Sequence, residues 1–511
     1  MGNELPVQTV AAKVGLRHVI EASIRLLIPF EVNSRALAET KTDMVARRLD
    51  GSGMWHRTSD PKQDKTIRDL DALTKAAFFD VKPNGFLYRH LAVEIPAHLQ
   101  WPQTDPALTV RMPIPANGVE LFLNPQGSGV VSLSLHWNEK TSGLDITALR
   151  CFLYQLGQTD LNEDSSDQTV PVQWSRKLRE CILEWTEPLR LEDSFQWLRR
   201  FLVVGARFGD DVGPFPLAHS NPQAVEVETM MWALAAALRP DMRVLPMPGV
   251  QLAALNPFHM AGVFESGAAH IVVDSPETEK HNEKRISWVQ GTYSLLTIHE
   301  ILYRNAAVNL IREARYVAEL PADSEETAEL TSKSRLEGGS RGQAVTELSR
   351  RLIEFQLYAD VTRAGPSQAI RTYYRMASAA LGGQESLVRL RQAVTALEQV
   401  EVAQRTATSA EKMVELQKKV ELLEVFIFGY YLIAVTHYVF HAFHIPESFT
   451  GGAYLIMAGV GAVSAFLDSG LRNHVFGHGW FGWWTSRPFW ILIAPILVFA
   501  ILFWLGLTSV H

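Results

Sequence analysis

Cysteine is scarce in this chain: its 511 residues include only two, Cys151 and Cys181, and neither belongs to a Cys-x-x-Cys pair. This argues against a disulfide framework and against a zinc site built from thiolates. The net charge is -7 and there is no long basic run, so we expect no nucleic-acid partner. The first residues, MGNELPVQTVAAKVGLRH, lack the positive start and apolar core of a secretory signal. These absences favour a reduced, cytoplasmic N-terminal body.

Motifs of common enzymes are missing as well. There is no GxGxxG, no phosphate loop ending in Gly-Lys-Ser or Gly-Lys-Thr, and no GxSxG elbow. The segment His299–Tyr303 begins like a zinc-protease helix but has Tyr303 where the second histidine would stand, so we assign it a structural or surface role. We therefore expect no enzymatic activity. Weaker candidates are three arginines for a phosphate or a solvated face, and two aspartates for a cation: Arg199, Arg200, Arg207, Asp210 and Asp211.

Charge is unevenly distributed along the chain. Beyond Ile445 the only charged residues are Glu447, Asp468, Arg472 and Arg487. Three apolar runs occur at 425–443, 451–467 and 489–507, close to the roughly 20 residues that a helix needs to cross a membrane. The sequence therefore predicts a C-terminal α-helical membrane domain at 425–511 with about three transmembrane helices.

Basic residues set the expected orientation of these helices. Lys412, Lys418 and Lys419 precede the first run, and Arg472 and Arg487 lie between the second and third. Because positive loops stay on the cytoplasmic side, we expect a multi-pass protein of the bacterial inner membrane with the lipid bilayer as partner and a cytoplasmic N-terminal body.

The N-terminal part, 1–320, has the pattern of an α/β domain. The segment 118–137 predicts a β-hairpin, since Val131, Leu133 and Leu135 alternate with serines around the turn NPQGSG. Helical spacing occurs at 144–156, a strand pattern begins at Ala269, and 286–320 is a long, mainly apolar helix. A polar linker follows at 321–342.

Long helices and a coiled-coil stalk are expected at 343–424. Two series of apolar residues have three-four spacing, separated by a polar stretch near Gln404 to Ala410. This pattern predicts a helical stalk that self-associates, and hence a homo-oligomer. The two series are Leu387, Leu390, Val394 and Leu397, and Met413, Leu416, Val420 and Leu423.

Polar residues follow one face of the first apolar run. At about 100° per residue, Tyr430, His437, His441 and His444 fall within an arc of roughly 60°. Such a stripe would line an ion path, or would hydrogen-bond across packed helices. Asp468 is a second candidate for an ion site, or simply the end of a short span.

This layout resembles the CorA-like superfamily of divalent-cation transporters. The resemblance implies an oligomeric membrane protein whose cytoplasmic domain gates cation passage, with a divalent cation as its cofactor. The superfamily's Gly-Met-Asn motif is absent, because the corresponding place reads Ala442-Phe443-His444-Ile445. The segment VELLEVFIFGYYLIAVTHYV, 420–439, is also similar to a family of bacterial membrane-anchored coiled-coil proteins of unknown activity. The alternative is therefore a non-transporting sensor or effector scaffold, in stress or antiphage defence, that binds a cytoplasmic ligand or protein.

Overall fold

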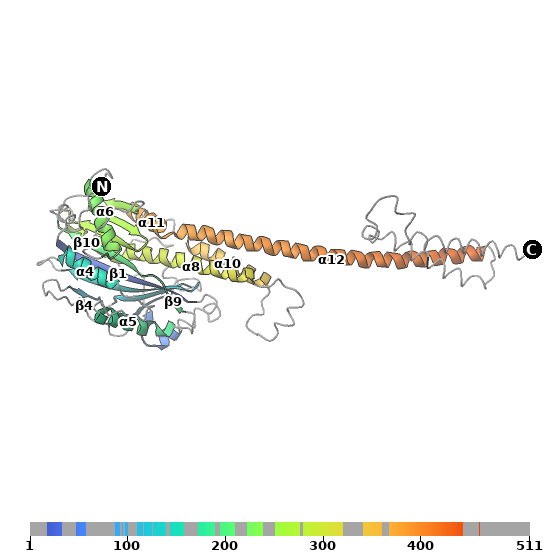
Figure 1. Cartoon of the computed structure of the whole chain (residues 1–511), viewed down its shortest axis with the longest axis horizontal. Coiled ribbons are helices and arrows are strands. Elements are labelled where there is room, and N and C mark those ends of the chain that lie inside the picture. Colours follow the sequence, from blue (N-terminus) through green and yellow to red (C-terminus); the bar gives the residue numbers. More distant parts are fainter. Residues whose placement is uncertain are drawn as a thin grey trace, which may run out of the picture. The chain divides into compact units, whose positions relative to one another are not determined.

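A computed structural model gives the fold of this chain (Figure 1). It describes most of the segment from residue 18 to residue 442, with gaps. The described residues are 18–32, 47–57, 87–91, 95, 98–100, 110–115, 117–124, 126–138, 144–157, 172–189, 195–209, 222–238, 251–275, 279–319, 341–359, 367–442 and 459.

A mixed sheet of 11 strands forms the centre of the α/β domain. Its strand order is β11-β12-β13-β10-β1-β7-β6-β3-β2, and β8 and β9 also pair with β1. The pairing of β10 with β13 is parallel, and the other pairings are antiparallel. The strands are β1 (His18–Val32), β2 (Trp55–Arg57), β3 (Leu87–Leu91), β6 (Val119–Leu123), β7 (Ser128–Asn138), β8 (Leu144–Asp145), β9 (Phe195–Trp197), β10 (Phe201–Phe208), β11 (Gln251–Asn256), β12 (His259–Phe264) and β13 (Gly267–Val273); a separate pair is β4 (His98–Gln100) and β5 (Arg111–Pro113).

The predicted hairpin is confirmed as β6 and β7. The Oδ1 atom of Asn124 accepts hydrogen bonds from the backbone N–H groups of Gln126 and Ser128, at 3.1 and 2.9 Å. Gly127 has a φ of 80°, which glycine adopts without the steric cost that a side chain brings. The hydrogen bonds and backbone geometry of this turn therefore fix the register in which β7 pairs with β6, and with it the face to which each side chain of β7 points.

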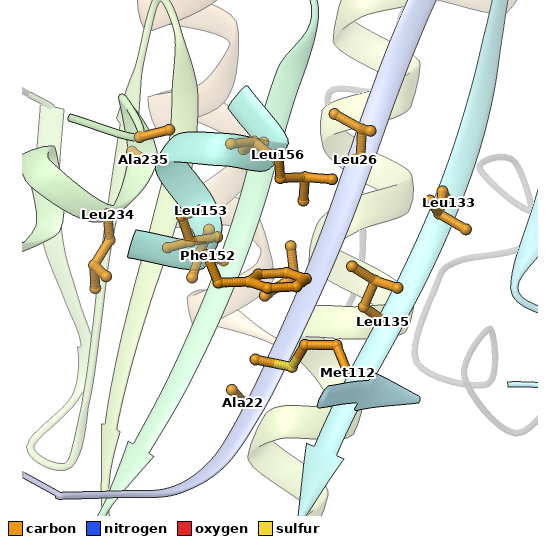
Figure 2. Packing of buried hydrophobic residues seen from close by; sticks show 14 of the residues in the cluster. Ala22, Leu26, Met112, Leu133, Leu135, Phe152, Leu153, Leu156, Leu234 and Ala235 are labelled. Carbon is orange, nitrogen blue, oxygen red and sulfur yellow. The ribbon is translucent and has the colours of Figure 1, made fainter. Parts of the chain in front are cut away.

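Helices cover both faces of the sheet. Leu149, Phe152, Leu153 and Leu156 of α4 pack into an apolar cluster on one face together with residues of α6, and Figure 2 shows this packing against β1 and β7. The other face contacts η6, α8 and α11. The bounds of these helices are α4 (Ile146–Gly157), α5 (Val172–Thr186), η3 (Glu187–Leu189), α6 (Pro222–Ala235), α7 (Glu279–Trp288), η6 (Val289–Tyr293), α8 (Ser294–Glu319) and α11 (Gln368–Leu381).

The long helix predicted at 286–320 is present, with one difference. Its path is divided into the end of α7, the π-helical turn η6 and α8. Periodicity alone does not reveal this turn, because one additional residue in a turn shifts an apolar pattern only slightly.

Three helices form a second packing unit beside the sheet. α8 packs with α10 (Arg341–Ala359) and with the first part of α12 (Gly383–Ala442). The first apolar series of the stalk, Leu387, Leu390, Val394 and Leu397, is buried in this cluster. The helical form predicted for the stalk is thus confirmed, but its first series packs within the chain.

Two compact units divide the chain, residues 1–399 and 400–511. The expected polar linker at 321–342 lies almost wholly outside the described residues, and the boundaries expected at 320 and 424 stay predictions.

The expected membrane domain is wrong. Among the residues that the structure describes, no helix is both long enough and apolar enough to cross a bilayer. The first predicted span falls on the end of α12, where tyrosines and the polar side chains of His437 and His441 interrupt the apolar run. The multi-pass inner-membrane location inferred from these runs is corrected with it. The runs at 451–467 and 489–507 lie outside the described residues, apart from residue 459.

Candidate functional site

Polar side chains gather on the sheet face that contacts η6 and α8. Along β1, Glu21, Ser23, Arg25 and Glu31 are all buried and alternate with apolar residues that face the other side. Ser128, Ser132 and Ser134 of β7 pair with residues of β1 in the adjacent strand. Because side chains alternate between the faces of a strand, this arrangement places a layer of polar side chains beneath the helices, beside apolar residues of the same face such as Leu27, Val130 and Val203. We take this layer, with the helix junction described below, as the candidate site.

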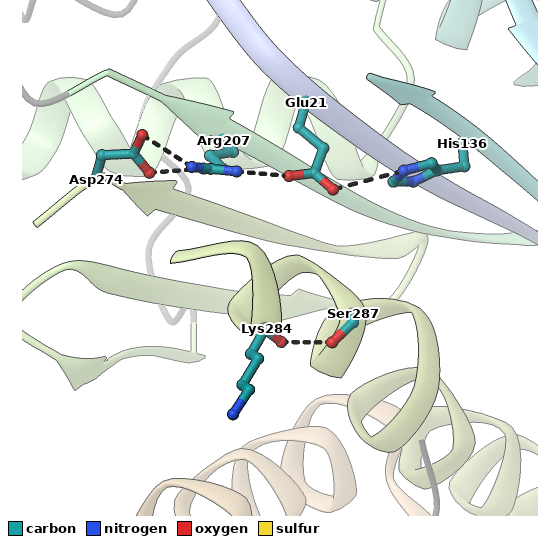
Figure 3. Close-up of polar contacts among 6 residues, drawn as sticks. All are labelled: Glu21, His136, Arg207, Asp274, Lys284 and Ser287. Atoms are coloured by element: carbon teal, nitrogen blue, oxygen red, sulfur yellow. Dashed lines mark hydrogen bonds and ion pairs between the residues drawn. The ribbon is translucent and has the colours of Figure 1, made fainter. Parts of the chain in front are cut away.

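A chain of charged groups occupies one part of this layer (Figure 3). Arg207 of β10 donates to both carboxylate oxygens of Asp274, at 2.6 and 3.1 Å, and to Oε2 of Glu21 at 3.0 Å. The other oxygen of Glu21 lies 3.5 Å from Nε2 of His136. Burial opposes the charge of Arg207, but the hydrogen bonds to Asp274 and Glu21 outweigh it and raise the pKa of Arg207. Arg207 is therefore hydrogen-bonded to these carboxylates and does not form a phosphate site.

Arg25 joins the middle of the layer to η6. Its Nε donates to Ser132 Oγ at 2.6 Å, its Nη1 donates to the backbone carbonyl of Gln290 at 2.8 Å, and its other terminal nitrogen pairs with Glu120. Gly205 lets the helix approach the sheet, since a Cβ atom there would lie 3.0 Å from a methyl group of Val289. The π-helical turn thus presents a carbonyl to a buried arginine, which satisfies a charge that would otherwise be costly to bury.

Two histidines lie at the α11 side of the layer. His259 Nε2 and His270 Nδ1 are 3.1 Å apart, so one nitrogen donates to the other. Tyr293 stacks on His270, and the Tyr373 hydroxyl hydrogen-bonds to Thr297 Oγ1 at 2.7 Å. Burial lowers the pKa of His259 to about 3 and that of His270 well below its usual range. Both rings therefore stay neutral at physiological pH, and their role is to fill and order the interface.

Glu300 is an ionisable group of this region whose pKa lies near neutral pH. It is fully buried on α8, and burial raises its pKa from the ordinary value of 4.5 to about 7. The hydroxyls of Tyr374 and Ser378 on α11 favour its charged form, although neither carboxyl oxygen makes a hydrogen bond of normal geometry within the described part of the chain. His299 Nδ1 lies 4.0 Å from one oxygen.

This carboxyl group also lies against the start of α12. A Cβ atom on Gly383, the first residue of α12, would lie only 2.5 Å from Glu300 Oε2. The preceding residue, Gly382, ends α11 with a φ of 69°. Three helices therefore meet at Glu300, an ionisable group for which the sequence motif predicts only a structural or surface role. The burial of Glu300 depends on contacts with residues distant in sequence, which no local motif shows. The pair of glycines at 382–383 was the available signal for a close approach.

The expected ion-path residues are only partly described. Tyr430, His437 and His441 lie on α12, where all three are exposed. His444 and Asp468 lie outside the described residues, as do Asp210 and Asp211. Of the described residues, no three histidine, cysteine or acidic side chains of a single chain lie close enough to hold a metal ion.

The second apolar series of the stalk is exposed in a single chain. Met413, Leu416, Val420 and Leu423 all lie on the surface of α12, and Leu416 is 60% exposed. The same three-four spacing continues through Ile427, Tyr430, Ala434, His437 and His441. In the letters of a heptad, positions a are 413, 420, 427, 434 and 441, and positions d are 416, 423, 430 and 437. We call this face the seam; the histidine stripe is its continuation.

No model of a known protein family matches this chain, and no curated protein matches its sequence. The resemblance to CorA-like transporters therefore stays an untested prediction about layout.

Proposed function

We propose that this protein is a non-enzymatic sensor or scaffold that self-associates through α12 and whose α/β domain binds a ligand or a partner protein. The observation that carries the proposal is the exposed seam. Large apolar side chains repeated every three or four residues on an unpacked helix favour pairing with another helix, because an isolated helix gains little stability from propensity alone.

A second copy of the same chain fits this seam by charge. Lys419 occupies position g and Glu424 position e of the following heptad. In a parallel pair these two side chains meet across the interface, whereas an antiparallel pair would place like charges together. Lys419 already bonds Glu415 within its own helix at 2.8 Å, and both groups are exposed. This charge pattern therefore selects orientation, while the apolar seam supplies most of the affinity.

The buried polar layer supports a sensing role for the α/β domain. An apolar core of the same volume would stabilise the fold at least as well, so buried charge networks are weak evidence for stability. Glu300, at the start of α12, offers a group whose charge changes near neutral pH. A ligand or partner that favours one charge state of Glu300 would thereby favour one arrangement of the α8, α11 and α12 junction.

The seam is tested by measuring the mass of the full-length chain in solution by light scattering. We expect a defined oligomer for the wild type and a monomer for the variant Leu416→Asp/Leu423→Asp, because the interface would bury two charges per chain. The matched control is Val414→Asp/Val435→Asp, which adds the same charges at exposed positions outside the seam. A monomeric wild type, or an equal loss of mass in both variants, would refute the proposal.

A further inference from the structure

His437 and His441 occupy adjacent layers of the seam. They are four residues apart on α12, one at position d and one at position a, and both are exposed in the single chain. Residues with this spacing lie on one face of a helix, about 6 Å apart along its axis. Two histidines so placed are a known helical arrangement for binding zinc.

We propose that paired copies of α12 bind a transition-metal ion, with Zn²⁺ as the best fit, through His437 and His441. The inference rests on the proposed self-association. The described part of the seam supplies two imidazoles per chain, and the described residues of a single chain hold no larger ligand group. In a parallel pair the same two positions of the second copy face them, which completes the four nitrogen ligands that Zn²⁺ prefers.

The surroundings of these histidines offer few competing ligands. From Val425 to Ala442 the sequence contains no Asp, Glu, Lys or Arg, so the histidines are its only nitrogen side-chain ligands. Neutral imidazole is a common zinc ligand. A seam made only for packing would more simply continue with Leu or Val at these positions.

Metal binding is tested with the full-length, untagged chain, using Zn²⁺ titration by calorimetry and the visible absorption of bound Co²⁺. We expect saturation at one ion for every two chains and a tetrahedral Co²⁺ spectrum. His437→Ala/His441→Ala should weaken binding at least about 100-fold, because loss of ligands costs more than loss of their supporting hydrogen bonds. The control His18→Ala/His56→Ala removes two exposed histidines of the α/β domain and should leave binding unchanged.

The seam variant Leu416→Asp/Leu423→Asp separates this inference from the proposed function. If the wild type is an oligomer but binds no metal, or if the control weakens binding as much, the metal site is refuted and self-association stands. If the seam variant is a monomer and binds Zn²⁺ as tightly as the wild type, a site shared between copies is refuted. If the wild type itself is a monomer, the proposed function fails and the shared site with it.

Discussion

The two faces of the central sheet are built from the same strands but differ in their polar content. One face of β1 contributes Ala22, Ile24 and Leu26 to an apolar cluster with α4 and α6. The other contributes Glu21 and Arg25 to a layer of charges and hydrogen bonds beneath η6 and α8. This difference teaches that the burial of a residue does not by itself show whether the residue contributes to stability or to function. The first face is held together by apolar packing, whereas the second combines an apolar cluster with the charged groups whose state can change.

Among substitutions in the apolar face, the largest effect is expected at Phe152. This residue of α4 is among the largest fully buried side chains, and it packs against β1 (Figure 2). We expect Phe152→Ala to lower the free energy of unfolding by about 4 kcal/mol, from lost burial and from the cavity left behind. Urea denaturation followed by near-ultraviolet circular dichroism measures this change. Ile353→Ala, at an exposed position of α10, should change it little; equal effects would contradict the assignment of this face.

The polar face should respond differently, because its members depend on one another. Arg207→Met leaves the buried carboxylate of Glu21 and the partly exposed carboxylate of Asp274 without their cation, so we expect a loss of about 3 kcal/mol. Adding Glu21→Met should recover part of the lost free energy of unfolding, since it removes one of the two carboxylates left without a cation. The four proteins of this double-mutant cycle are compared by urea denaturation. Strictly additive losses would mean that Arg207 and Glu21 act independently.

Glu300 makes the contribution of the polar face to stability depend on pH. Its pKa is raised from 4.5 to about 7 on folding, so the folded state binds more protons between these values and the stability contributed by the protonated group is lost as pH rises. Glu300→Gln removes this dependence. Relative to the wild type, the variant should gain about 2 kcal/mol in the free energy of unfolding between pH 5 and pH 7.5.

The control for this measurement is Glu385→Gln, at an exposed position in the first turn of α12. It should show no such gain over the same pH range. A Glu300→Gln variant whose stability follows the wild type at every pH would show that folding does not raise the pKa of this carboxyl group.

Local patterns in the sequence predicted much of the fold but little of the site. The alternation of Val131, Leu133 and Leu135 with serines identified the β6–β7 hairpin, because both strands are adjacent in the chain. A similar alternation at Glu21, Ser23 and Arg25, followed by the apolar run 26–30, was the missed signal for the central strand β1. The partners of Arg25 and Arg207 lie in other strands and in η6, and no short pattern specifies such pairings.

Apolar runs were the least reliable guide. The run at 425–443 was interpreted as a span, although its three-four spacing continues the stalk and places Tyr430, His437 and His441 in register with Leu416 and Leu423. The heptad register was available in the sequence. Composition alone cannot distinguish a helix that is apolar because it meets lipid from one that is apolar because it meets another helix.

The central position of β1 has a consequence for synthesis on the ribosome. β1 is the first strand to emerge, yet it pairs with β7 and with β10, which ends at Phe208. At the usual rates of translation, the edge of β1 that pairs with β10 has no partner for on the order of ten seconds or more, until β10 is synthesised. Through that interval a mostly apolar strand stays open to pairing with other nascent chains. The order of the strands thus leaves one edge of the central strand without its partner until β10 has been synthesised.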